Sequence, residues 1–345
     1  MKRFLLWSFA VIVLGALGAA AFFLNTFHRF AETPFGSGAP VVEIPAGSGP
    51  HATAALLKKN GVVSDANLFV LYVRHFRHAG ALLKHGEYAF ALPMTPDQVI
   101  DKLVAGDVVQ HRITLPEGLR IDEMAPIFEA SGLCSELTFS QLVRNPNLAR
   151  KWNIDGDSLE GWIFPDTYSF TKGESAETFL GSLVARAKRE LAAARTVAPS
   201  TLSDREVMTL ASIVEKETAQ PEERPRVSCV FHNRLQRGIK LQTDPTVIYA
   251  KLLRLGSFDG NITKGDLVEP HPYNTYTVKG LPPGPIASPG VAAIRAALAP
   301  LACDDLFFVS KNDGTHVFCP DLACHEANVR KWQIDYFRRQ HAANR

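Results

Sequence analysis

The sequence carries no excess of charge of either sign: 37 lysines and arginines stand against 35 aspartates and glutamates, a net charge of +2 over 345 residues. It also has no block of basic residues and no basic-aromatic motif, so we expect no nucleic-acid partner. Hydrophobic residues make up 46% of the chain, which supports a substantial core. At about 150 residues per domain, the length allows two or three domains.

Cysteine is scarce, and its spacing lacks the tight C-x2-C pair of structural zinc sites. The five cysteines are Cys134, Cys229, Cys303, Cys319 and Cys324. In an exported chain some would pair, and the last three lie near each other, so we expect one disulfide among them. The connectivity is not deducible, and the odd count leaves at least one free thiol. A zinc site at Cys319 and Cys324 with His316 and His325 is the weaker alternative.

Charge is absent from one long apolar run, Phe4 to Leu24. Its length is close to the ~20 residues that cross a bilayer. Lys2 and Arg3 precede it, so we expect a single-pass anchor in the inner (cytoplasmic) membrane, with residues 1–3 in the cytoplasm and the rest periplasmic or extracytoplasmic. A cleaved signal peptide ending near the small residues Ala19 to Ala21 is the alternative, although the run exceeds the ~7–15 residues of a signal core.

The segment after the anchor predicts a linker over 25–40, where Pro34 and several small residues lie. A small α+β unit over 41–112 should follow, and the remainder, 113–345, forms a larger domain of mixed α/β character. The small unit holds no catalytic constellation, so a binding or positioning role is its default. Its expected strands are 41–44, 86–90 and 108–115, and its expected helices are 51–60, 67–78 and 95–105.

The stretch around which the chain is organised runs from 205 to 233, and the run 209–218 inside it predicts an amphipathic helix. Its apolar residues follow the i, i+3, i+4, i+7 spacing of one helical face, and Ser203 or Asp204 supplies its N-cap. The apolar run ends in two acids, Glu215 and Glu217. Glu217 falls beside the larger apolar neighbours, so desolvation should raise its pKa more than that of Glu215. The alternative is that both acids are solvated on the helix surface.

Three loop stretches are also dense in distinctive residues. The stretch 159–168 is rich in aromatics and indicates either a folded loop or a sugar-binding cleft. The polar turn 241–246 precedes a helix, and Thr243 or Asp244 could cap it. The stretch 280–290 holds four prolines and three glycines, so it forms neither helix nor central strand. Such a rigid loop should position something.

Together these stretches resemble the YceG-like endolytic murein transglycosylase (MltG) family. The resemblance rests on five motifs in the family's order: Leu159-Glu160-Gly161-Trp162 with Phe164-Pro165-Asp166-Thr167-Tyr168, Ala211-Ser212-Ile213-Val214-Glu215-Lys216-Glu217, Leu241-Gln242-Thr243-Asp244-Pro245-Thr246, Tyr273-Asn274-Thr275-Tyr276, and Gly280-Leu281-Pro282-Pro283-Gly284-Pro285-Ile286. It covers nearly the whole chain. It implies an α+β fold with a transmembrane helix over 4–24, a LysM-like subdomain over 41–112 and a catalytic domain over 113–345.

The resemblance implies a lytic transglycosylase, a lyase that cleaves the MurNAc–GlcNAc bond within nascent peptidoglycan strands and leaves a 1,6-anhydro-MurNAc end, which would terminate strand elongation. The family's catalytic acid maps to Glu217, with Glu215 as the fallback. We expect neither a metal nor an organic cofactor. Expected partners are glycan strands, the membrane and peptidoglycan synthases. The alternative is a non-catalytic, membrane-anchored glycan-binding scaffold. The candidates for holding the sugar, each equally suited to bonding a loop, are Gln242, Asp244, Asn274 and Tyr276.

Overall fold

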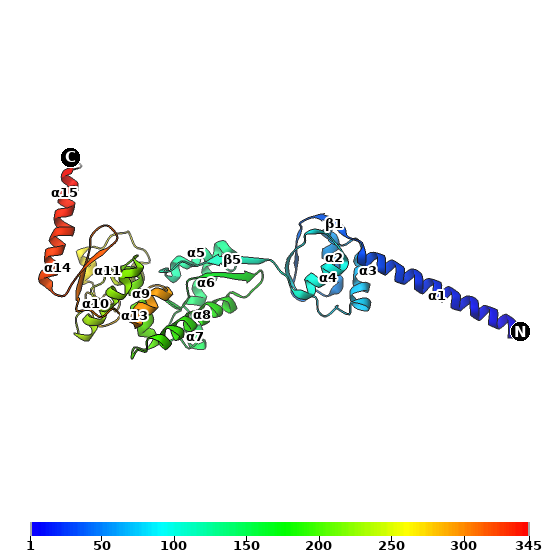
Figure 1. Ribbon diagram of the computed structural model, residues 1–345, viewed down its shortest axis with the longest axis horizontal. Coiled ribbons are helices and arrows are strands. Elements are labelled where there is room, and N and C mark those ends of the chain that lie inside the picture. Colours follow the sequence, from blue (N-terminus) through cyan, green and yellow to red (C-terminus); the bar gives the residue numbers. More distant parts are fainter. Residues whose placement is uncertain (1, 344–345) are drawn as a thin grey trace. The chain divides into compact units, whose positions relative to one another are not determined.

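The structure, a computed structural model, describes residues 2–343 and divides them into two compact units. Unit 1 comprises the chain up to His111 together with Ser169–Gly173, and unit 2 comprises Arg112–Tyr168 and the chain from Glu174 onward. The mixture of helices and short strands is the α+β architecture expected from the sequence. Figure 1 shows the elements along the chain.

Unit 1 packs its helices against two small antiparallel sheets, in which β1 pairs with β4 and β2 pairs with β3. The register of the second sheet places Glu43 opposite Glu87. The elements of unit 1 are α1 (Lys2–Glu32), β1 (Phe35–Gly38), β2 (Val41–Ile44), α2 (Pro50–Lys59), α3 (Ala66–Leu71), the π-helix η1 (Tyr72–Phe76), β3 (Gly86–Ala89), β4 (Leu92–Met94) and α4 (Pro96–Ala105).

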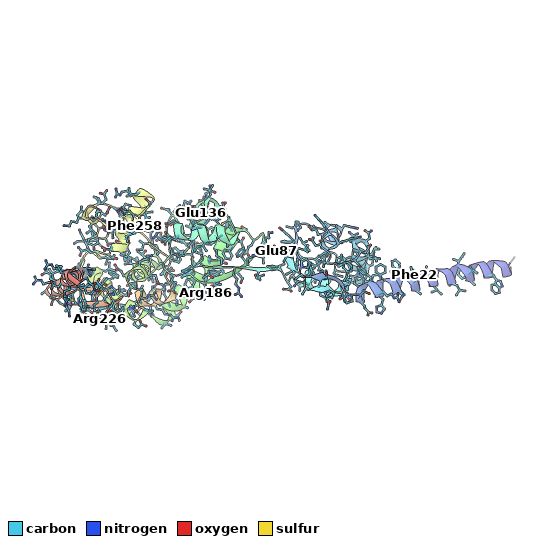
Figure 2. All side chains as sticks on the ribbon, turned by 90° about the horizontal axis from the view of Figure 1, so that it is seen from above. Phe22, Glu87, Glu136, Arg186, Arg226 and Phe258 are labelled. Atoms are coloured by element: carbon cyan, nitrogen blue, oxygen red, sulfur yellow. A yellow bond between two sulfur atoms is a disulfide. The ribbon has the colours of Figure 1, made fainter. Side chains whose placement is uncertain are left out.

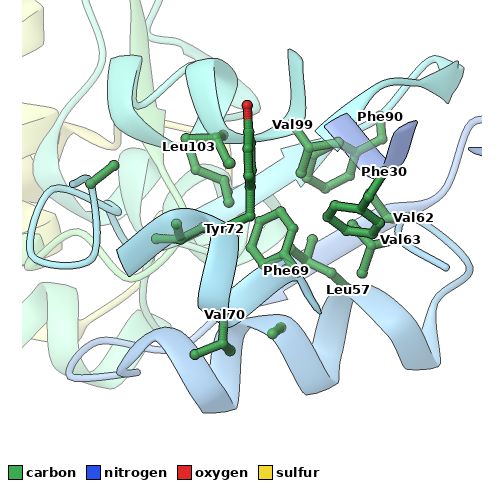
Figure 3. Close-up of a cluster of buried hydrophobic side chains, with 14 of the residues drawn as sticks. Phe30, Leu57, Val62, Val63, Phe69, Val70, Tyr72, Phe90, Val99 and Leu103 are labelled. Carbon is green, nitrogen blue, oxygen red and sulfur yellow. The ribbon is translucent and has the colours of Figure 1, made fainter. Parts of the chain in front are cut away.

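The expected linker over 25–40 is wrong, because α1 continues to Glu32 and β1 follows at once. Phe27, Phe30 and Ala31 are buried in the core of unit 1, where Figure 3 shows Phe30 among the other apolar side chains. Their spacing of three and four residues continues one helical face beyond the apolar run. Burying these rings favours helix, and Pro34 marks only its end.

The first helix holds one stretch, Phe9–Glu32, that is long and apolar enough to cross a membrane by length and composition, with a mean hydropathy of 2.0. Its side chains from Trp7 to Leu24 that the structure describes are exposed. This segment therefore has the character expected of a single-pass anchor.

Unit 2 is built mainly of helices, and β5 (Gln110–Thr114) leads the chain into it. This strand pairs with β6 (Thr167–Thr171), and β7 (Phe307–Ser310) pairs with β8 (His316–Cys319) in an antiparallel hairpin. The helices are α5 (Ile121–Ser131), α6 (Glu136–Val143), α7 (Pro146–Lys151), α8 (Ala176–Val197), α9 (Asp204–Glu217), η2 (Pro221–Glu223), α10 (Arg224–Gln236), α11 (Asp244–Leu255), α12 (Lys264–Val268), α13 (Val291–Leu298), α14 (Leu322–Val329), η3 (Arg330–Asp335) and α15 (Tyr336–Ala343).

The central element of unit 2 is α9, which packs against α10, α11 and α13. Ser203 caps it in a capping box with Glu206. Every residue from Val207 to Val214 is buried, so the helix is enclosed on all sides and not on the single face that its pattern predicted. The buried hydroxyls of Thr209 and Ser212 bond to backbone carbonyls of the same helix, which makes their enclosure tolerable.

Two disulfides hold the C-terminal part of unit 2. One joins Cys319 to Cys324, which is the disulfide expected among the last three cysteines. The other joins Cys229 of α10 to Cys303. Cys134 is free. Because the first disulfide consumes two thiols of the proposed zinc ligand set, that alternative loses its thiolates.

Candidate functional site

An open cavity of about 420 Å³ lies at the C-terminal end of α9. One carboxyl at its wall is Glu217, the last residue of that helix. The other lining residues come from α10, the turn before α11, the loop after α12, the β7 strand and α14: Arg234, Leu241, Gln242, Asp244, Tyr276, Phe307, Phe308, Leu322 and His325.

The carboxyl of Glu217 is held so that it keeps a proton near neutral pH. Burial raises its pKa to about 7, and the nearby charge of Asp244 acts in the same direction. The hydroxyl of Thr243 donates a hydrogen bond to Oε1 and opposes this shift, because a donor stabilises the ionised form. Desolvation by burial therefore acts on this residue.

The hydroxyl of Thr243 is fixed by the backbone that carries it. Thr243 occupies the N-cap position of α11, yet its side chain makes no cap bond to that helix and reaches Glu217 instead. Its N–H donates to Thr275 Oγ1 at 3.1 Å, and its carbonyl accepts from Thr246 Oγ1 at 2.7 Å. The three threonines are buried, so the donor to Glu217 belongs to a rigid network.

A buried guanidinium forms another part of the cavity wall. Arg234 is 7% exposed, and its Nε donates to Leu306 O at 2.6 Å while Nη1 donates to Leu241 O at 2.8 Å. It lies over the ring of Phe307, 4.9 Å from the centroid. Its positive charge favours the ionised form of Glu217. The sequence did signal this residue, because Arg234 continues the buried stripe of Val227, Val230 and Phe231 on α10.

Three of the four candidate sugar contacts line the cavity. Gln242 has a φ of 50°, a left-handed conformation, and its Oε1 lies 3.4 Å from Arg234 Nη1. Asp244 begins α11 and accepts a hydrogen bond of 2.7 Å from the hydroxyl of Tyr276. The two side chains therefore meet beside Glu217 as a polar pair.

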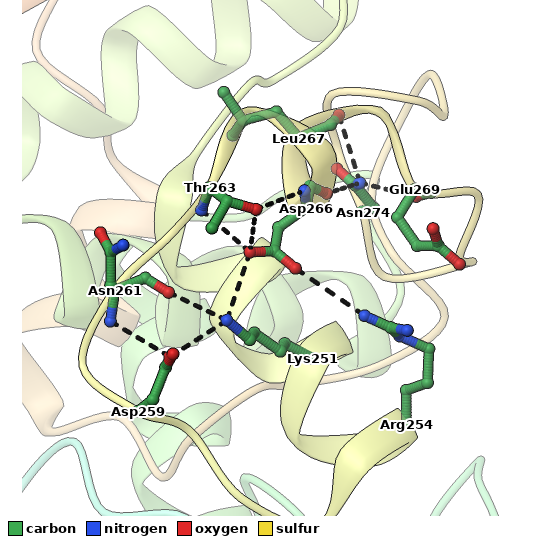
Figure 4. Close-up of polar contacts among 9 residues, drawn as sticks. All are labelled: Lys251, Arg254, Asp259, Asn261, Thr263, Asp266, Leu267, Glu269 and Asn274. Atoms are coloured by element: carbon green, nitrogen blue, oxygen red, sulfur yellow. Dashed lines mark hydrogen bonds and ion pairs between the residues drawn. The ribbon is translucent and has the colours of Figure 1, made fainter.

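The fourth candidate, Asn274, does not line this cavity and is 1% exposed. Its Nδ2 donates to the carbonyls of Asp266, Leu267 and Glu269 at 3.0, 3.4 and 2.8 Å, as Figure 4 shows. Its Oδ1 accepts from the N–H of Tyr276. Asn274 thus folds the loop that presents Tyr276, and it has no free group to offer a ligand.

The other acid of α9 lies away from the cavity. Glu215 has a side chain 6% exposed and forms an ion pair of 2.7 Å with Arg224, and its Oε2 accepts the N–H of Gly290 at 3.0 Å. Burial raises its pKa, while that N–H and the guanidinium oppose the rise. Arg224 and the N–H of Gly290 therefore stabilise the carboxylate of Glu215 within the fold.

The Pro/Gly-rich loop 280–290 packs on α9 and contributes no lining residue to the cavity. The N–H of Ile286 donates to Ser212 Oγ at 3.0 Å. A Cβ at Gly290 would lie only 1.9 Å from the carboxylate of Glu117, so a larger residue there would require that side chain to move. We expected this loop to position something. Its Gly290 N–H holds the carboxylate of Glu215, on the side of the helix away from the cavity.

The aromatic stretch 159–168 is a folded loop and not a cleft. Trp162 and Phe164 are buried. Glu160 is 4% exposed; it accepts a hydrogen bond of 3.2 Å from Tyr249 and one of 3.3 Å from the N–H of Ile121. Burial raises the pKa of Glu160 to about 8, and its two hydrogen bonds tie the loop to α5 and α11.

Sequence reasoning missed the wall supplied by the C-terminal hairpin and α14. No site role was expected for Phe307, Phe308 or Leu322, and His325 entered only the zinc alternative. The disulfide between Cys319 and Cys324 ties this hairpin to α14. No local pattern places that hairpin beside α9, because the contact joins residues about a hundred positions apart.

This geometry defines a site with one proton-holding carboxyl in an open cavity of mixed polar and apolar lining, backed by a hydroxyl donor and a buried guanidinium. Such a site suits general acid–base catalysis by a single group.

Comparisons with known proteins agree with that class. The model of the YceG-like family matches residues 42–331. An endolytic murein transglycosylase of Bacillus subtilis strain 168 is 31% identical over 309 residues, covering 84% of each chain. One of Streptococcus pneumoniae strain D39 is 28% identical over 321 residues, although this chain spans 57% of its length. The crystal structure of a YceG-like protein of Listeria monocytogenes, 31% identical, superposes with a TM-score of 0.56 and covers 84% of this chain and 99% of that one. The chain belongs to the YceG-like family.

Proposed function

We propose that this protein is an endolytic murein transglycosylase that cuts the MurNAc–GlcNAc bond within peptidoglycan strands, with Glu217 as its single acid and base. Support comes from relatives that carry this name over most of the chain. The observation that carries the residue assignment is the carboxyl of Glu217, which faces the cavity with a pKa raised to about 7.

In the first step, protonated Glu217 gives its proton to the glycosidic oxygen as the bond from MurNAc C1 breaks. Its carboxylate then takes the proton of the C6 hydroxyl as that oxygen bonds to C1. The product is a 1,6-anhydro end, no water is consumed, and Glu217 recovers its proton. Ordinary glycosidases use a second carboxyl to attack or to activate water. A pKa near neutrality suits one group to both steps, because it must lose and regain the proton.

In this proposal, each residue around Glu217 has a role in the reaction or in binding the sugar. Thr243 and Arg234 stabilise the carboxylate between the two proton transfers. Gln242, Asp244 and Tyr276 hold sugar hydroxyls at the cavity wall. Asn274 acts as a positioning residue that shapes the loop of Tyr276.

The proposal also places the enzyme at the membrane. The helix α1 crosses the cytoplasmic membrane with its basic N-terminus inside, which leaves both units on the outer side. There the cavity meets nascent strands, and cleavage ends their elongation. Peptidoglycan synthases, which make those strands, are the proposed protein partners.

The test is digestion of purified peptidoglycan by the detergent-solubilised full chain, with mass spectrometry of the products. Transglycosylation predicts internal cuts whose muropeptides end in anhydro-MurNAc and are one water lighter than reducing-end products. Reducing ends would mean a hydrolase. Strand binding without any cleavage would mean the non-catalytic scaffold.

A further inference from the structure

One part of the cavity wall has no role in the proposed binding of sugar hydroxyls. Its members lie on α10, β7 and α14, and we call them the C-terminal wall: Arg234, Phe307, Phe308, Leu322 and His325. The guanidinium of Arg234 lies 4.9 Å from the centroid of the Phe307 ring, and the ring of His325 stacks on the same ring with centroids 4.9 Å apart. Phe307 therefore joins the cation and the imidazole into one surface of the cavity.

The guanidinium of Arg234 keeps one nitrogen for a ligand. Its Nε and Nη1 donate to the carbonyls of Leu306 and Leu241, at 2.6 and 2.8 Å. Its Nη2 has no hydrogen-bond partner within residues 2–343, and it is not among their buried, unbonded side-chain atoms. Since Arg234 lines the cavity, Nη2 offers its N–H donors to a molecule that the cavity holds.

Another arginine of α10 shows what a fully partnered guanidinium looks like here. Arg226, labelled in Figure 2, lies 4.6 Å from the centroid of the Phe318 ring of the same hairpin. Its Nε forms an ion pair of 2.8 Å with Asp305. The hydrogen-bond partners of Arg234 are instead neutral carbonyl oxygens. Arg234 is therefore held in place by neutral acceptors, with a donor left over for another one.

The ring of His325 adds a neutral polar group beside that donor. Burial lowers the pKa of His325, and the positive charge of Arg234 acts in the same direction. From an ordinary value of about 6.5, the ring is therefore uncharged at neutral pH, with one nitrogen donating and the other accepting. Neither ring nitrogen has a hydrogen-bond partner in the described part of the chain, and of the two only Nδ1 is buried. Nε2 is thus available to a ligand.

The other members of the C-terminal wall are apolar, and Leu322 is 55% exposed. A donor, a neutral polar group and an apolar surface together suit a ligand group that has three matching parts. The 2-acetamido group of an N-acetylated sugar has them: a carbonyl oxygen, an N–H and a methyl group. A carboxylate fits less well, because it has no apolar part and would bring negative charge toward Glu217 and Asp244.

We propose that the C-terminal wall is the subsite that recognises a 2-acetamido group of the glycan strand. Arg234 Nη2 donates to the carbonyl oxygen, His325 Nε2 accepts the amide N–H, and Leu322 contacts the methyl group. This inference rests on the proposed function and makes the enzyme selective for N-acetylated strands. A de-N-acetylated sugar loses all three contacts and brings an ammonium toward the guanidinium, which is a like charge.

Chemically matched strands test the inference with the detergent-solubilised full chain. One sample of peptidoglycan is de-N-acetylated on GlcNAc and another on MurNAc, each by a deacetylase specific for that sugar. Part of each sample is then re-acetylated with acetic anhydride, and anhydride-treated native strands are the reference. The rate of anhydro-muropeptide release gives kcat/KM for every sample. The two deacetylated samples show which sugar's acetamido group is bound.

We expect de-N-acetylation of one of the two sugars to lower kcat/KM by about 10- to 100-fold, the range for loss of a hydrogen bond to a charged group. Re-acetylation should restore the rate. Equal rates on native and on both de-N-acetylated strands, with anhydro ends in all, would overturn the inference and leave the proposed function standing. If native strands are not cut at all, the proposed function fails and the inference falls with it.

A variant of each polar member assigns the selectivity to the C-terminal wall. Arg234→Lys keeps the positive charge but lacks Nη2, so it should slow cleavage of native strands about tenfold and of the sensitive de-N-acetylated strands less than about twofold. Arg226→Lys, on the same helix, is the matched control and should leave both rates unchanged. The ratio of the two rates is the readout, because a general loss of folded protein lowers both rates equally.

His325→Ala is the second variant, because α14 has no buried residue and alanine favours a helix. It should reduce the ratio severalfold, mainly through a higher KM on native strands, whereas His325→Gln, which keeps a donor and an acceptor, should retain more of it. Glu326→Ala is the matched control on α14. A ratio equal to that of the parent in both Arg234→Lys and His325→Ala would place acetamido recognition outside the C-terminal wall.

Discussion

Two sides of α9, which we call the loop side and the cavity side, each hold one acid in a different setting. On the loop side, Glu215 meets the guanidinium of Arg224 at 2.7 Å and the N–H of Gly290 at 3.0 Å. On the cavity side, Glu217 meets the hydroxyl of Thr243 and has no cation within ion-pair distance among the described residues. Burial raises the pKa of both acids.

This comparison teaches that desolvation alone does not define a catalytic acid. A buried carboxyl with a cation and an amide donor is stabilised as an ion and serves the fold. A buried carboxyl given only a hydroxyl donor keeps a proton that it can transfer, provided that a substrate can reach it. Only Glu217, of these two, lines the cavity.

The strongest way to break the comparison is to neutralise each acid in turn. Glu217→Gln should lower kcat/KM by about 10²–10⁴, the usual contribution of a general acid, because the amide has no proton of suitable acidity. Glu215→Gln, the matched control two residues away on the same helix, should stay within about tenfold of the parent. The rate of anhydro-muropeptide release measures both. Equal losses would place the chemistry on the loop side or on neither side.

Although removing Glu217 should cost more activity, removing Glu215 should cost more unfolding free energy. Glu215→Ala leaves the 9% exposed side chain of Arg224 without its close partner. Breaking a buried ion pair from one side costs about 3–5 kcal/mol of unfolding free energy. Thermal and urea unfolding of the purified chain measure this loss.

The double variant Glu215→Leu with Arg224→Met is the control, because it removes both charges and retains apolar volume. It should recover much of the lost stability. A single variant as stable as the parent would mean that the ion pair contributes nothing to the loop side.

The sequence predicted this contrast in part. The helix α9 and its cap at Ser203 are local features and are confirmed, although the helix is enclosed on all sides; burial also raises the pKa of Glu217, as expected. The partners of the two acids are not local. Arg224 and the loop of Gly290 reach Glu215, and Thr243 reaches Glu217, through packing that no periodic pattern contains. Thr243 even looked like a helix cap, since its position is that of an N-cap.

Other features of the structure were not predicted because they too depend on contacts or short elements that leave no pattern in the sequence. The helices α6 and α7 span eight and six residues, too few turns for a periodic signal, and were not expected. The disulfide between Cys229 and Cys303 closes 74 positions and left no trace in spacing. The buried role of Asn274 was also hidden, because an asparagine in a loop suits a ligand and a turn equally.

The pH dependence of stability sharpens the comparison on the cavity side. The pKa of Glu217 is raised to about 7 in the folded chain, against about 4.3 for an unfolded glutamate. The folded state therefore holds the proton more tightly, and ionisation costs stability as pH rises from about 4 to 7. Allowing for partial exposure, Glu217→Gln should be more stable than the parent by about 1–2 kcal/mol at pH 8.

Below about pH 4 that difference should vanish, since the parent carboxyl is then protonated in both states. Melting curves of the two proteins from pH 4 to pH 8 measure it. A constant offset across the range would show that the pKa of Glu217 is not raised by folding.

The smallest effect we expect concerns the single donor to Glu217. Thr243→Val removes the hydroxyl that stabilises the carboxylate, so the pKa of Glu217 should rise. Activity requires the protonated acid in the free enzyme, and the alkaline limb of the kcat/KM profile reports that pKa. The limb should move upward by about one pH unit, the size of a modest hydrogen bond to a charged group.

Thr243→Ser is the matched control, since it keeps the donor and should keep the limb of the parent. Thr243→Ser loses only the methyl group, whereas Thr243→Val loses only the hydroxyl. Comparing the two variants therefore separates the effect of the hydrogen bond on the pKa of Glu217 from the effect of side-chain shape. A limb that moves equally in both variants would trace the effect to the packing of the Thr243, Thr246 and Thr275 network. A downward shift in the valine variant would mean that the hydroxyl favours the protonated acid, which would reverse its role in the contrast between the two sides of α9.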